Sequence, residues 1–268
     1  MPVRVWCRTI RQLRHEGFLQ TCYCNDDPFS PRAIWGLHLH FLKALPLFNH
    51  HFLFRKKNIS DFSKKRCDSC TLLSPYFPDQ ALCLKKQKIS KFKYDAVFIG
   101  HWENDGRLEK LEFLARRGLR AQVHGSIWER KVLAKSPLRG PFRSTFGPKS
   151  WALYRESHGS LCFFSKLNND CWTRRPLEIV AAGGLLICER TAEAQSHFTE
   201  DQEALYFSSA EELYQQVLRA KNNSSMARVM RERALARLKK GRYSLGDRVK
   251  DMMEIWDVKI KERREGVF

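Results

Sequence analysis

The sequence predicts an α/β fold with a parallel sheet. From residue 94 onward, short apolar runs alternate with amphipathic segments of roughly ten residues, which is the pattern of βαβ units. Hydrophobic residues make up 43% of the chain and aromatic residues 12%, so the chain has enough apolar side chains for a packed core. Glycine follows or ends several of the apolar runs, as at Gly100 and Gly125, where a strand would turn toward the next helix.

The second part of the chain is predicted to be a Rossmann-like domain. The unbroken apolar run at residues 94–100 predicts a strand that is buried on both faces. Residues 106–117 carry leucines at helical spacing, and Gly118 ends that pattern. Further strands are predicted at residues 120–124, 161–165, 185–188 and 204–207. Further helices are predicted at residues 151–157, 174–182, 210–220, 226–238 and 248–260.

The first part of the chain is predicted to be a smaller, incomplete α/β domain. Its strands are expected at residues 18–24, 52–54 and 71–73, and its helices at residues 5–14, 32–45 and 60–65. Three short strands make a sheet that buries little apolar surface by itself. The expected organisation is therefore a partial N-terminal domain at residues 1–93, a second domain at residues 94–245 and a C-terminal helix at residues 246–268.

The chain is strongly basic. It has 48 Lys and Arg against 29 Asp and Glu, a formal net charge of +19, and such a charge attracts polyanions. The basic residues are spread over residues 55–66, 85–93, 228–240 and 259–264, without a zinc-finger, RNP or basic-zipper motif. Nucleic acid is therefore the less favoured partner, and a solvated basic surface that can also contact an anionic membrane is the favoured interpretation.

Two features of the sequence bear on location. No apolar run approaches the roughly 18 residues that a spanning helix needs. Arg4, Arg8, Arg11 and Arg14 interrupt the place where the apolar core of a signal peptide would lie. We expect a cytoplasmic protein, with peripheral contact to the membrane through its amphipathic C-terminal helices as the alternative.

The cysteines and histidines raise the question of a metal. Cys22 with Cys24, and Cys67 with Cys70, could form a zinc site, but C-x-C paired with a distant C-D-S-C is an imperfect ligand pattern. The paired or clustered histidines lack metal spacing with a carboxylate and are expected on surfaces or in packing: His38, His40, His50 and His51. No metal is expected.

The densest group of polar residues lies at residues 167–184, between two predicted strands. A polar loop there leads into a helix whose first N–H groups favour phosphate. Arg174 and Arg175 add donors suited to a diphosphate, and Glu178 could accept hydrogen bonds from a ribose diol. Gly183 and Gly184 let the end of the helix approach the sheet. The segment predicts a nucleotide-diphosphate site, with an ordinary helix N-terminus and surface arginines as the alternative.

The stretch T-R-R-P-L-E-I-V-A-A-G-G-L-L-I-C-E-R-T at residues 173–191 resembles the C-terminal signature of the CgeB-like (spore-maturation type) glycosyltransferases. It is also similar to the wider retaining glycosyltransferases of the GT-B fold. The elements D-D-P-F at residues 26–29, the run ending at Gly100 with Arg107, and His124-Gly125 with Trp128 agree with that family in the same order. The resemblance covers about residues 10–250 and implies a GT-B fold.

The resemblance also implies roles for individual residues. Glu178 matches the second carboxylate of the family's paired acidic motif, which contacts the donor ribose, and Asp170 stands at the first position, where the wider group has the longer glutamate. Arg174 or Arg175 would hold the diphosphate beside Thr173, with the loop after Gly100 and its Arg107 close by. Gly125 and Trp128 would border the nucleotide, and Gly183 and Gly184 complete the expected donor-binding set. Asp27 in the D-D-P-F element is a second catalytic candidate beside Asp170.

The family's first domain normally begins with several βα units before the D-D-P-F element, which this chain reaches by residue 26. We therefore expect that units holding much of the acceptor site lie upstream or are shortened. The GT-B resemblance, together with the absence of a D-x-D triplet, implies transfer without a metal.

The expected function is transfer of a sugar from a nucleotide-diphosphate donor, a UDP sugar by preference, to a cell-envelope glycan or to another glycan, lipid or protein acceptor. The nucleotide sugar is a co-substrate, so no cofactor is expected. A truncated module that binds nucleotide sugar without transfer is the first alternative. A basic protein that binds nucleic acid or an anionic membrane is the second.

Overall fold

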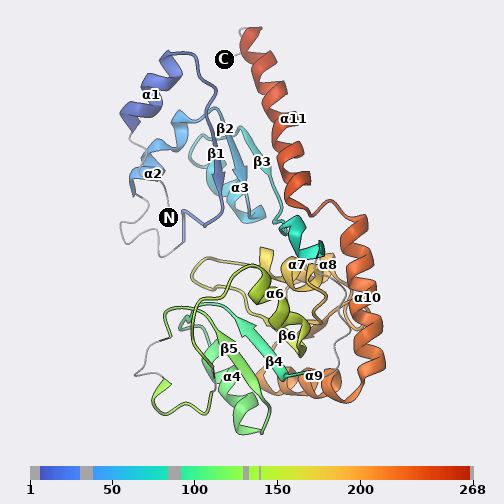
Figure 1. Cartoon of the computed structure of the whole chain (residues 1–268). Coiled ribbons are helices and arrows are strands. Elements are labelled where there is room, and N and C mark those ends of the chain that lie inside the picture. The colour runs from blue at the N-terminus through green and yellow to red at the C-terminus, as the bar shows by residue number, and fades with distance from the viewer. Residues whose placement is uncertain (1–6, 31–38, 84–91, 129–132, 139, 266–268) are drawn as a thin grey trace. The chain divides into compact units, whose positions relative to one another are not determined.

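The computed structural model describes residues 7–30, 39–83, 92–128, 133–138 and 140–265 (Figure 1). The chain forms two compact units, and each is described by itself. Unit 1 comprises Met1–Pro75, Lys166–Asp170 and Leu245–Phe268. Unit 2 comprises Tyr76–Ser165 and Cys171–Ser244.

Unit 1 is built on a parallel sheet of order β1-β2-β3. Its strands are β1 (Thr21–Cys24), β2 (His50–Leu53) and β3 (Cys70–Leu72). Its helices are α1 (Cys7–His15), α2 (Leu39–Ala44), the 3-10 turn η2 (Leu45–Leu47), α3 (Lys56–Ser63) and α11 (Leu245–Arg264). The predicted small α/β sheet in this part of the chain is present.

The two faces of this sheet are covered by different helices. On one face Cys24 and Leu53 pack with Phe62 of α3 in a small apolar core. On the other face the indole of Trp256 on α11 contacts the ring of Phe52 and donates a hydrogen bond of 3.1 Å to Thr21 Oγ1. The predicted C-terminal helix thus belongs to unit 1, because its aromatic anchor buries the second face of that sheet.

His50, on the same face as Phe52, is a buried histidine that stays neutral. Its side chain is within hydrogen-bond distance of Ser69 Oγ (2.9 Å) and Thr71 Oγ1 (3.0 Å), and the residue is 3% exposed. Burial, assisted by the positive charge of Lys259, lowers the pKa of His50 to about 4.

The low pKa of His50 predicts that the folded protein loses stability in mild acid. The unfolded chain binds a proton below its pKa of 6.5, whereas the folded chain does so only near pH 4, so the stability from this group is complete above about pH 6.5 and is lost toward about pH 4. We expect a loss of about 2 kcal/mol between about pH 7 and about pH 5. Urea unfolding of the wild type and of His50→Gln at both pH values separates the contribution of His50 from that of the other histidines. The same pH dependence in the variant would contradict the assignment.

Unit 2 is a larger parallel sheet of order β5-β4-β6-β7-β8. Its strands are β4 (Tyr94–Ile99), β5 (Ala121–His124), β6 (Ser157–Cys162), β7 (Leu186–Glu189) and β8 (Leu205–Phe207). Its helices are the 3-10 helix η3 (Asp79–Cys83), α4 (Arg107–Arg116), α6 (Pro148–Arg155), α7 (Arg174–Ala181), α8 (Ala192–His197), α9 (Ala210–Asn222) and α10 (Ser224–Lys240). The Rossmann-like parallel sheet is confirmed.

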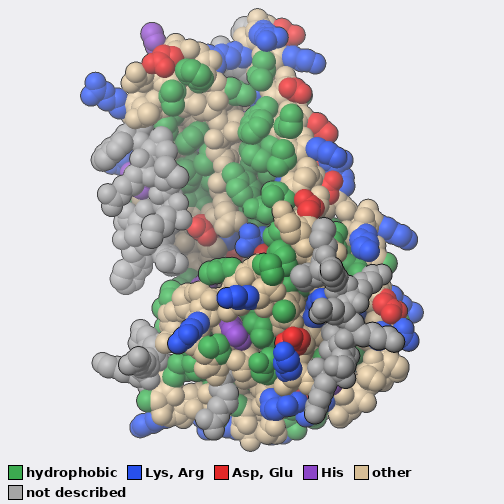
Figure 2. All heavy atoms as spheres, in the orientation of Figure 1, with side chains coloured by type: hydrophobic (Ala, Val, Ile, Leu, Met, Phe, Trp, Pro, Cys, Tyr) green, Lys and Arg blue, Asp and Glu red, His purple; other side chains and the backbone are tan. Residues whose placement is uncertain are grey.

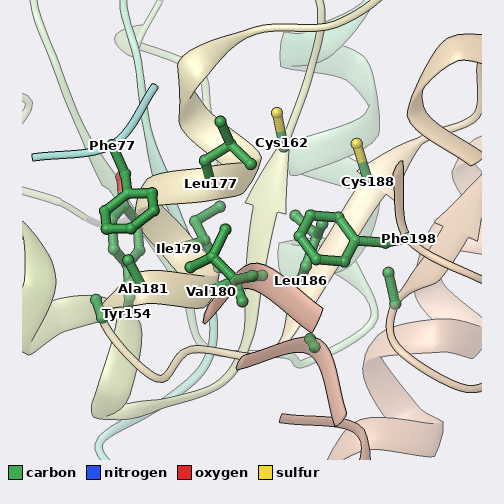
Figure 3. Close-up of a cluster of buried hydrophobic side chains, with 14 of the residues drawn as sticks. Phe77, Tyr154, Cys162, Leu177, Ile179, Val180, Ala181, Leu186, Cys188 and Phe198 are labelled. Carbon is green, nitrogen blue, oxygen red and sulfur yellow. The ribbon is translucent and has the colours of Figure 1, made fainter. Parts of the chain in front are cut away.

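Helices cover both faces of this sheet because alternate strand residues point to opposite sides. Ala96 and Phe98 of β4 pack with Leu111 of α4 on one side. Val97 and Ile99 pack with α7 on the other side, in the core shown in Figure 3. The buried strands therefore appear in the sequence as continuous apolar runs.

Most predicted elements are present, with shifted bounds. The strand predicted at residues 161–165 starts earlier, at Ser157, because its first half consists of small or polar residues that carry no apolar signal. The helices α8 and η3 were not predicted. Residues 76–93, expected in the first domain, lie in unit 2, where Phe77 and Ala81 are buried in its core. Residues 5–6 and 32–38 of two predicted helices, His38 among them, lie outside the described residues.

The basic side chains are distributed over the surface. On the face shown in Figure 2, Lys and Arg stand among acidic, hydrophobic and other groups and form no continuous band. Residues 85–91 of one basic segment lie outside the described part of the chain. None of the described helices is both long enough and apolar enough to traverse a bilayer.

Candidate functional site

The order of strands in unit 2 reverses at β4. The chain passes from β4 to its neighbour β5, and then crosses to β6 on the other side of β4. In parallel α/β sheets ligands bind at this switch point, between the loops that follow the two central strands. The loops after β4 and β6 are therefore the candidate site of unit 2.

A polar cluster joins these two loops. Glu103, after β4, accepts a hydrogen bond of 2.8 Å from the hydroxyl of Ser165, after β6. Its other oxygen lies 2.6 Å from Nε2 of His101, whose side chain is 47% exposed. Although burial opposes ionisation, the hydrogen bond from His101 and the charge of Arg107 hold the pKa of Glu103 below its ordinary value. The carboxylate fixes the proton of His101 on Nε2 and leaves Nδ1 for a further partner.

Arg107 does not fit the predicted role as a diphosphate ligand. Its side chain is 4% exposed and donates to both oxygens of Asp105 at 2.6 and 2.8 Å and to the carbonyl of His101 at 2.8 Å. It also lies 3.4 Å from Glu103. These hydrogen bonds occupy the donors of Arg107 within the loop after β4. Arg107 therefore stabilises the loop that carries His101 and has few donors left for a ligand. The half-exposed polar side chain of this loop is His101.

The predicted trio Gly100, Gly125 and Trp128 does come together at the ends of β4 and β5. A Cβ on Gly125 would lie 1.8 Å from the carbonyl oxygen of Gly100, and Gly125 has φ +146°. The indole N–H of Trp128 donates a hydrogen bond of 3.0 Å to the same Gly100 oxygen. Trp128 is 8% exposed, and its ring packs edge-on to Phe98. It therefore stabilises the conformation of this loop as part of the core.

The predicted donor residues on α7 form a compact ion-pair group. Glu178 is 7% exposed, and its two oxygens accept from Arg174 Nε at 2.9 Å and Arg175 Nη1 at 3.2 Å. Arg175 also donates 2.8 Å to the hydroxyl of Tyr154, whose pKa burial raises to about 12. Arg174 is about half exposed and can exchange its bond to Glu178 for a bond to a ligand.

The other predicted residues of this segment divide by position. Thr173, in extended conformation, precedes the first turn of α7, and its side chain makes no capping bond, so the first amides of the helix remain available to an anion. Gly183 and Gly184 lie beyond the opposite end of α7. Gly183 has φ +81° and follows the end of the helix, and a Cβ added to Gly184 would lie 3.0 Å from both Ser160 Oγ and Tyr154 Cβ. Both glycines allow helix and sheet to pack closely, and their binding role stays a prediction.

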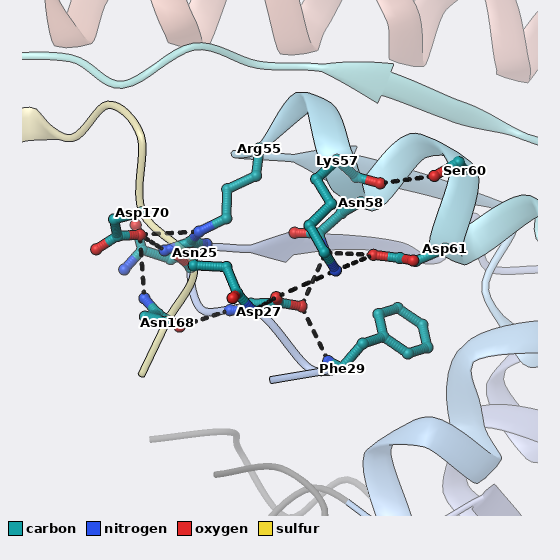
Figure 4. A network of polar contacts seen from close by, with 11 residues as sticks. Asn25, Asp27, Phe29, Arg55, Lys57, Asn58, Ser60, Asp61, Asn168 and Asp170 are labelled. Atoms are coloured by element: carbon teal, nitrogen blue, oxygen red, sulfur yellow. Dashed lines mark hydrogen bonds and ion pairs between the residues drawn. The ribbon is translucent and has the colours of Figure 1, made fainter. Parts of the chain in front are cut away.

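The two predicted catalytic carboxylates lie in unit 1. Asp27 is 0% exposed and accepts hydrogen bonds from the Phe29 amide (2.9 Å), Asn58 (2.8 Å) and Asn169 (2.8 Å), as Figure 4 shows in part. Although burial opposes ionisation, these bonds and the charge of Lys57 hold the pKa of Asp27 below its ordinary value. A general base needs an open lone pair and a pKa near neutrality, so this environment does not fit the predicted catalytic role.

Asp170 lies in the same polar network. It forms a buried ion pair with Arg55, which also donates 2.7 Å to the carbonyl of Asn25 (Figure 4). Asn168 links the backbone of Asp27 to the Asp170 carboxylate, because its oxygen accepts from the Asp27 amide at 2.9 Å and its nitrogen lies 3.4 Å from Asp170 Oδ1. These bonds hold the Lys166–Asp170 segment against the residues that follow β1 and against the start of α3. The network therefore fixes the position of this segment in unit 1.

Several residues of these sites were not predicted: His101, Glu103, Ser165, Arg55 and Asn58. His101 and Glu103 follow Gly100 at the end of a predicted strand, which is a detectable signal. Arg55 and Asn58 carried no signal, because their partners are distant in sequence. Among the described residues, no group of three or more His, Cys, Asp or Glu side chains is arranged to hold a metal ion.

Solved structures with the same architecture support this description. The chain is similar to sucrose-phosphate synthase from Thermosynechococcus elongatus, with 11% identity, a TM-score of 0.66 and coverage of 94% of this chain and 70% of that chain. It is similar to HepE from Anabaena in complex with UDP, with 10% identity, a TM-score of 0.69 and coverage of 94% and 76%. It is also similar to the UDP-forming α,α-trehalose-phosphate synthase from Burkholderia vietnamiensis, with 13% identity, a TM-score of 0.64 and coverage of 94% and 70%.

At such identities these likenesses show the fold, and the parallel sheets of the two units are those of a GT-B glycosyltransferase. The family assignment comes from the sequence. The model of the family described as glycosyl transferase-like matches residues 107–254, more than half of the chain, and the chain belongs to that family. No curated protein sequence matches the chain significantly.

Proposed function

We propose that the chain transfers a sugar from a UDP sugar and binds this donor at the switch point of unit 2. The observation that carries the proposal is the cluster in which Ser165 and Glu103 join the loops on both sides of the switch point and orient the half-exposed His101. Family membership and neighbours solved with UDP and UDP-glucose support a nucleotide-sugar donor.

The charges of unit 2 suit a diphosphate leaving group. Arg174, at the start of α7, is a half-exposed cation, the half-exposed imidazole of His101 offers a further polar partner, and the first amides of α7 add donors. As the bond between sugar and phosphate breaks, negative charge grows on the diphosphate, and fixed donors stabilise it. When a ligand takes over the hydrogen bond of Arg174, the Glu178 carboxylate becomes able to accept hydrogen bonds from the ribose hydroxyls.

The finer features of the proposal rest on the resemblance at residues 173–191 and, for location and membrane contact, on the composition and charge of the chain. They are a CgeB-like subtype, transfer without a metal, a cytoplasmic protein with peripheral contact to anionic membrane, and a glycan, lipid or protein acceptor. The resemblance places Asp170 opposite the sugar, whereas Asp170 is held by Arg55 in a buried ion pair. We therefore propose a positioning role for Asp170.

Nucleotide titration tests the donor site directly. We expect UDP to raise the melting temperature of the wild type, with smaller effects of GDP, ADP and CMP. Glu178→Gln should bind UDP about tenfold more weakly, because one charged hydrogen bond contributes about 1.5 kcal/mol or more. Glu232→Gln is the matched control, because Glu232 also pairs with a helical arginine but is exposed. Equal UDP affinity of Glu178→Gln and wild type, with both folded, would remove Glu178 from the site.

A module that binds donor without transfer is the second candidate, because Asp27 and Asp170 are both committed to structural bonds. The two candidates differ in donor turnover. Release of UDP from UDP-glucose by the full chain, with water or an added glycan as acceptor, supports the transferase. Tight UDP binding without any release supports the module.

A further inference from the structure

We propose that Cys22 is a reactive thiolate that exchanges with low-molecular-weight disulfides, so that unit 1 carries a thiol-modification site on β1. This site is separate from the proposed donor site and does not depend on the proposed function. It rests on a row of side chains across the sheet of unit 1, on an unpartnered buried histidine, and on a neighbouring thiol.

The row is fixed by strand register. Cys22 of β1 pairs with His51 of β2, and His51 pairs with Cys70 of β3, so the three side chains lie side by side on one face of the sheet. Two residues further along β1, Cys24 points to the same face, and its sulfur lies 3.7 Å from that of Cys22. Cys22 is only partly buried and packs at the margin of the core that contains Cys24 and Phe62.

His51 is the second observation. It is 1% exposed, its ring packs edge-on to Phe62 with centroids 4.9 Å apart, and its Nδ1 is buried without a hydrogen-bond partner. A buried polar atom without a partner is costly, and a neighbouring anion relieves that cost. The thiolate of Cys22, the neighbour of His51 on β1, is an anion that can relieve this cost.

The surrounding groups favour the charged form of Cys22. A hydrogen bond from Cys24 lowers the pKa of Cys22 to about 6, against the opposing effect of burial, and the neighbouring imidazole of His51 adds to this effect. The bond to Cys22 and burial raise the pKa of Cys24, and burial raises the pKa of Cys70 to about 11, so these two neighbours remain thiols. Only one sulfur of the cluster is therefore a strong nucleophile near neutral pH.

The geometry disfavours two simpler uses of these cysteines. No group of three described His, Cys, Asp or Glu side chains is arranged around a metal position, and Cys70 donates instead to the carbonyl of Cys67 at 2.8 Å. A disulfide between Cys22 and Cys24 would join residues about 6.6 Å apart along an extended strand, near the upper limit of about 6.8 Å for disulfide Cα atoms. The exchange therefore stops at the mixed disulfide.

The chemistry is balanced by the reagent. The Cys22 thiolate attacks one sulfur of the disulfide, the bond between Cys22 and that sulfur forms as the reagent's S–S bond breaks, and the other sulfur leaves as a thiolate. The protein thiol is oxidised and half of the reagent is reduced, so no further oxidant is needed. A small thiol reverses the modification.

The test is a pH profile of exchange on the full chain, with DTNB as the disulfide and peptide mass mapping to identify each modified cysteine. We expect the Cys22 rate to rise with a midpoint near pH 6 and then level off. The exposed Cys171 serves as the internal control for access of the reagent. At about pH 6.5 the larger thiolate fraction of Cys22, reduced by its lower intrinsic nucleophilicity, gives a rate about fivefold that of an equally accessible ordinary thiol. Above about pH 7.5 the order reverses, because an ordinary thiol is then ionised enough for its higher intrinsic nucleophilicity to decide.

Two variants identify the groups that activate Cys22. Cys24→Ala and His51→Phe should each move the midpoint of Cys22 upward, whereas Cys171→Ser should leave it unchanged. A wild-type midpoint near that of Cys171, or no adduct on Cys22 in the folded chain, would overturn the proposal. A loss of two hydrogens at Cys22 and Cys24 without reagent adduct would also overturn it, in favour of a disulfide within the strand.

Discussion

Replacing Arg55 with alanine is expected to destabilise unit 1 by about 3 to 5 kcal/mol. Arg55 is 6% exposed, holds Asp170 in an ion pair, and donates to the Asn25 carbonyl. Its removal leaves the Asp170 carboxylate in a low-dielectric environment without the cation that stabilises it, and such a charge is costly. Urea unfolding measures the loss, and hydrogen exchange of the peptides that contain β1 and β2 assigns it to unit 1.

Lys57→Ala is the matched control for Arg55→Ala. Lys57 is a cation of the same network, but its side chain is 50% exposed and its closest partner is Asp61 at 2.6 Å. Because exposed ion pairs contribute little, we expect a loss of less than about 1 kcal/mol. If the two variants lost equal stability, the buried ion pair of Arg55 would have no special role.

Gly125→Ala is expected to be the most damaging small substitution in unit 2, with a loss of more than about 4 kcal/mol or failure to fold. The new Cβ would lie 1.8 Å from the Gly100 oxygen and 2.5 Å from its carbon, and both are backbone atoms that no rotamer change can move away. The strand ends at the switch point would have to separate. Circular dichroism and urea unfolding of the full chain measure the effect.

Gly118→Ala separates this steric effect from backbone strain. Gly118 has φ +81°, and an added Cβ would meet no atom of the described chain within 4 Å. The substitution should therefore cost only about 1 to 2 kcal/mol, the usual penalty of a left-handed conformation. A Gly125→Ala protein as stable as Gly118→Ala would contradict the close approach of the two strand ends.

The sequence predicted the α/β architecture because periodicity is local. The run at β4 and the leucines of α4 are apolar at each position that the core requires, so strand and helix are visible within about ten residues. Where the buried positions hold small or polar side chains, the signal fails. The start of β6 is such a place, because Ser157 and Ser160 are buried there by hydrogen bonds to the Tyr154 carbonyl.

The candidate site was predicted in position but less well in chemistry. Its segments follow strands, and the ends of parallel strands meet at one edge of the sheet, so the loops that carry Gly100, Gly125 and Arg174 could be singled out from the sequence, while their binding roles stay predictions. The environment of each side chain depends on partners far along the chain. Asp27 is saturated by Asn58 and Asn169, which are 31 and 142 residues away in sequence. No local pattern shows that these bonds leave a carboxylate unable to act as a base.

The membership of Lys166–Asp170 in unit 1 has a consequence for dissecting the protein. A gene fragment for residues 76–244 would encode all of unit 2 but would carry these five residues away from the strands that receive them. Asn169 would lose Asp27, and Asp170 would lose Arg55, at the entrance to α7. The fragment 76–244 is therefore expected to have a helix α7 that begins from an unanchored loop, and its coexpression with residues 1–75 and 245–268 is the better route to reconstituting the protein.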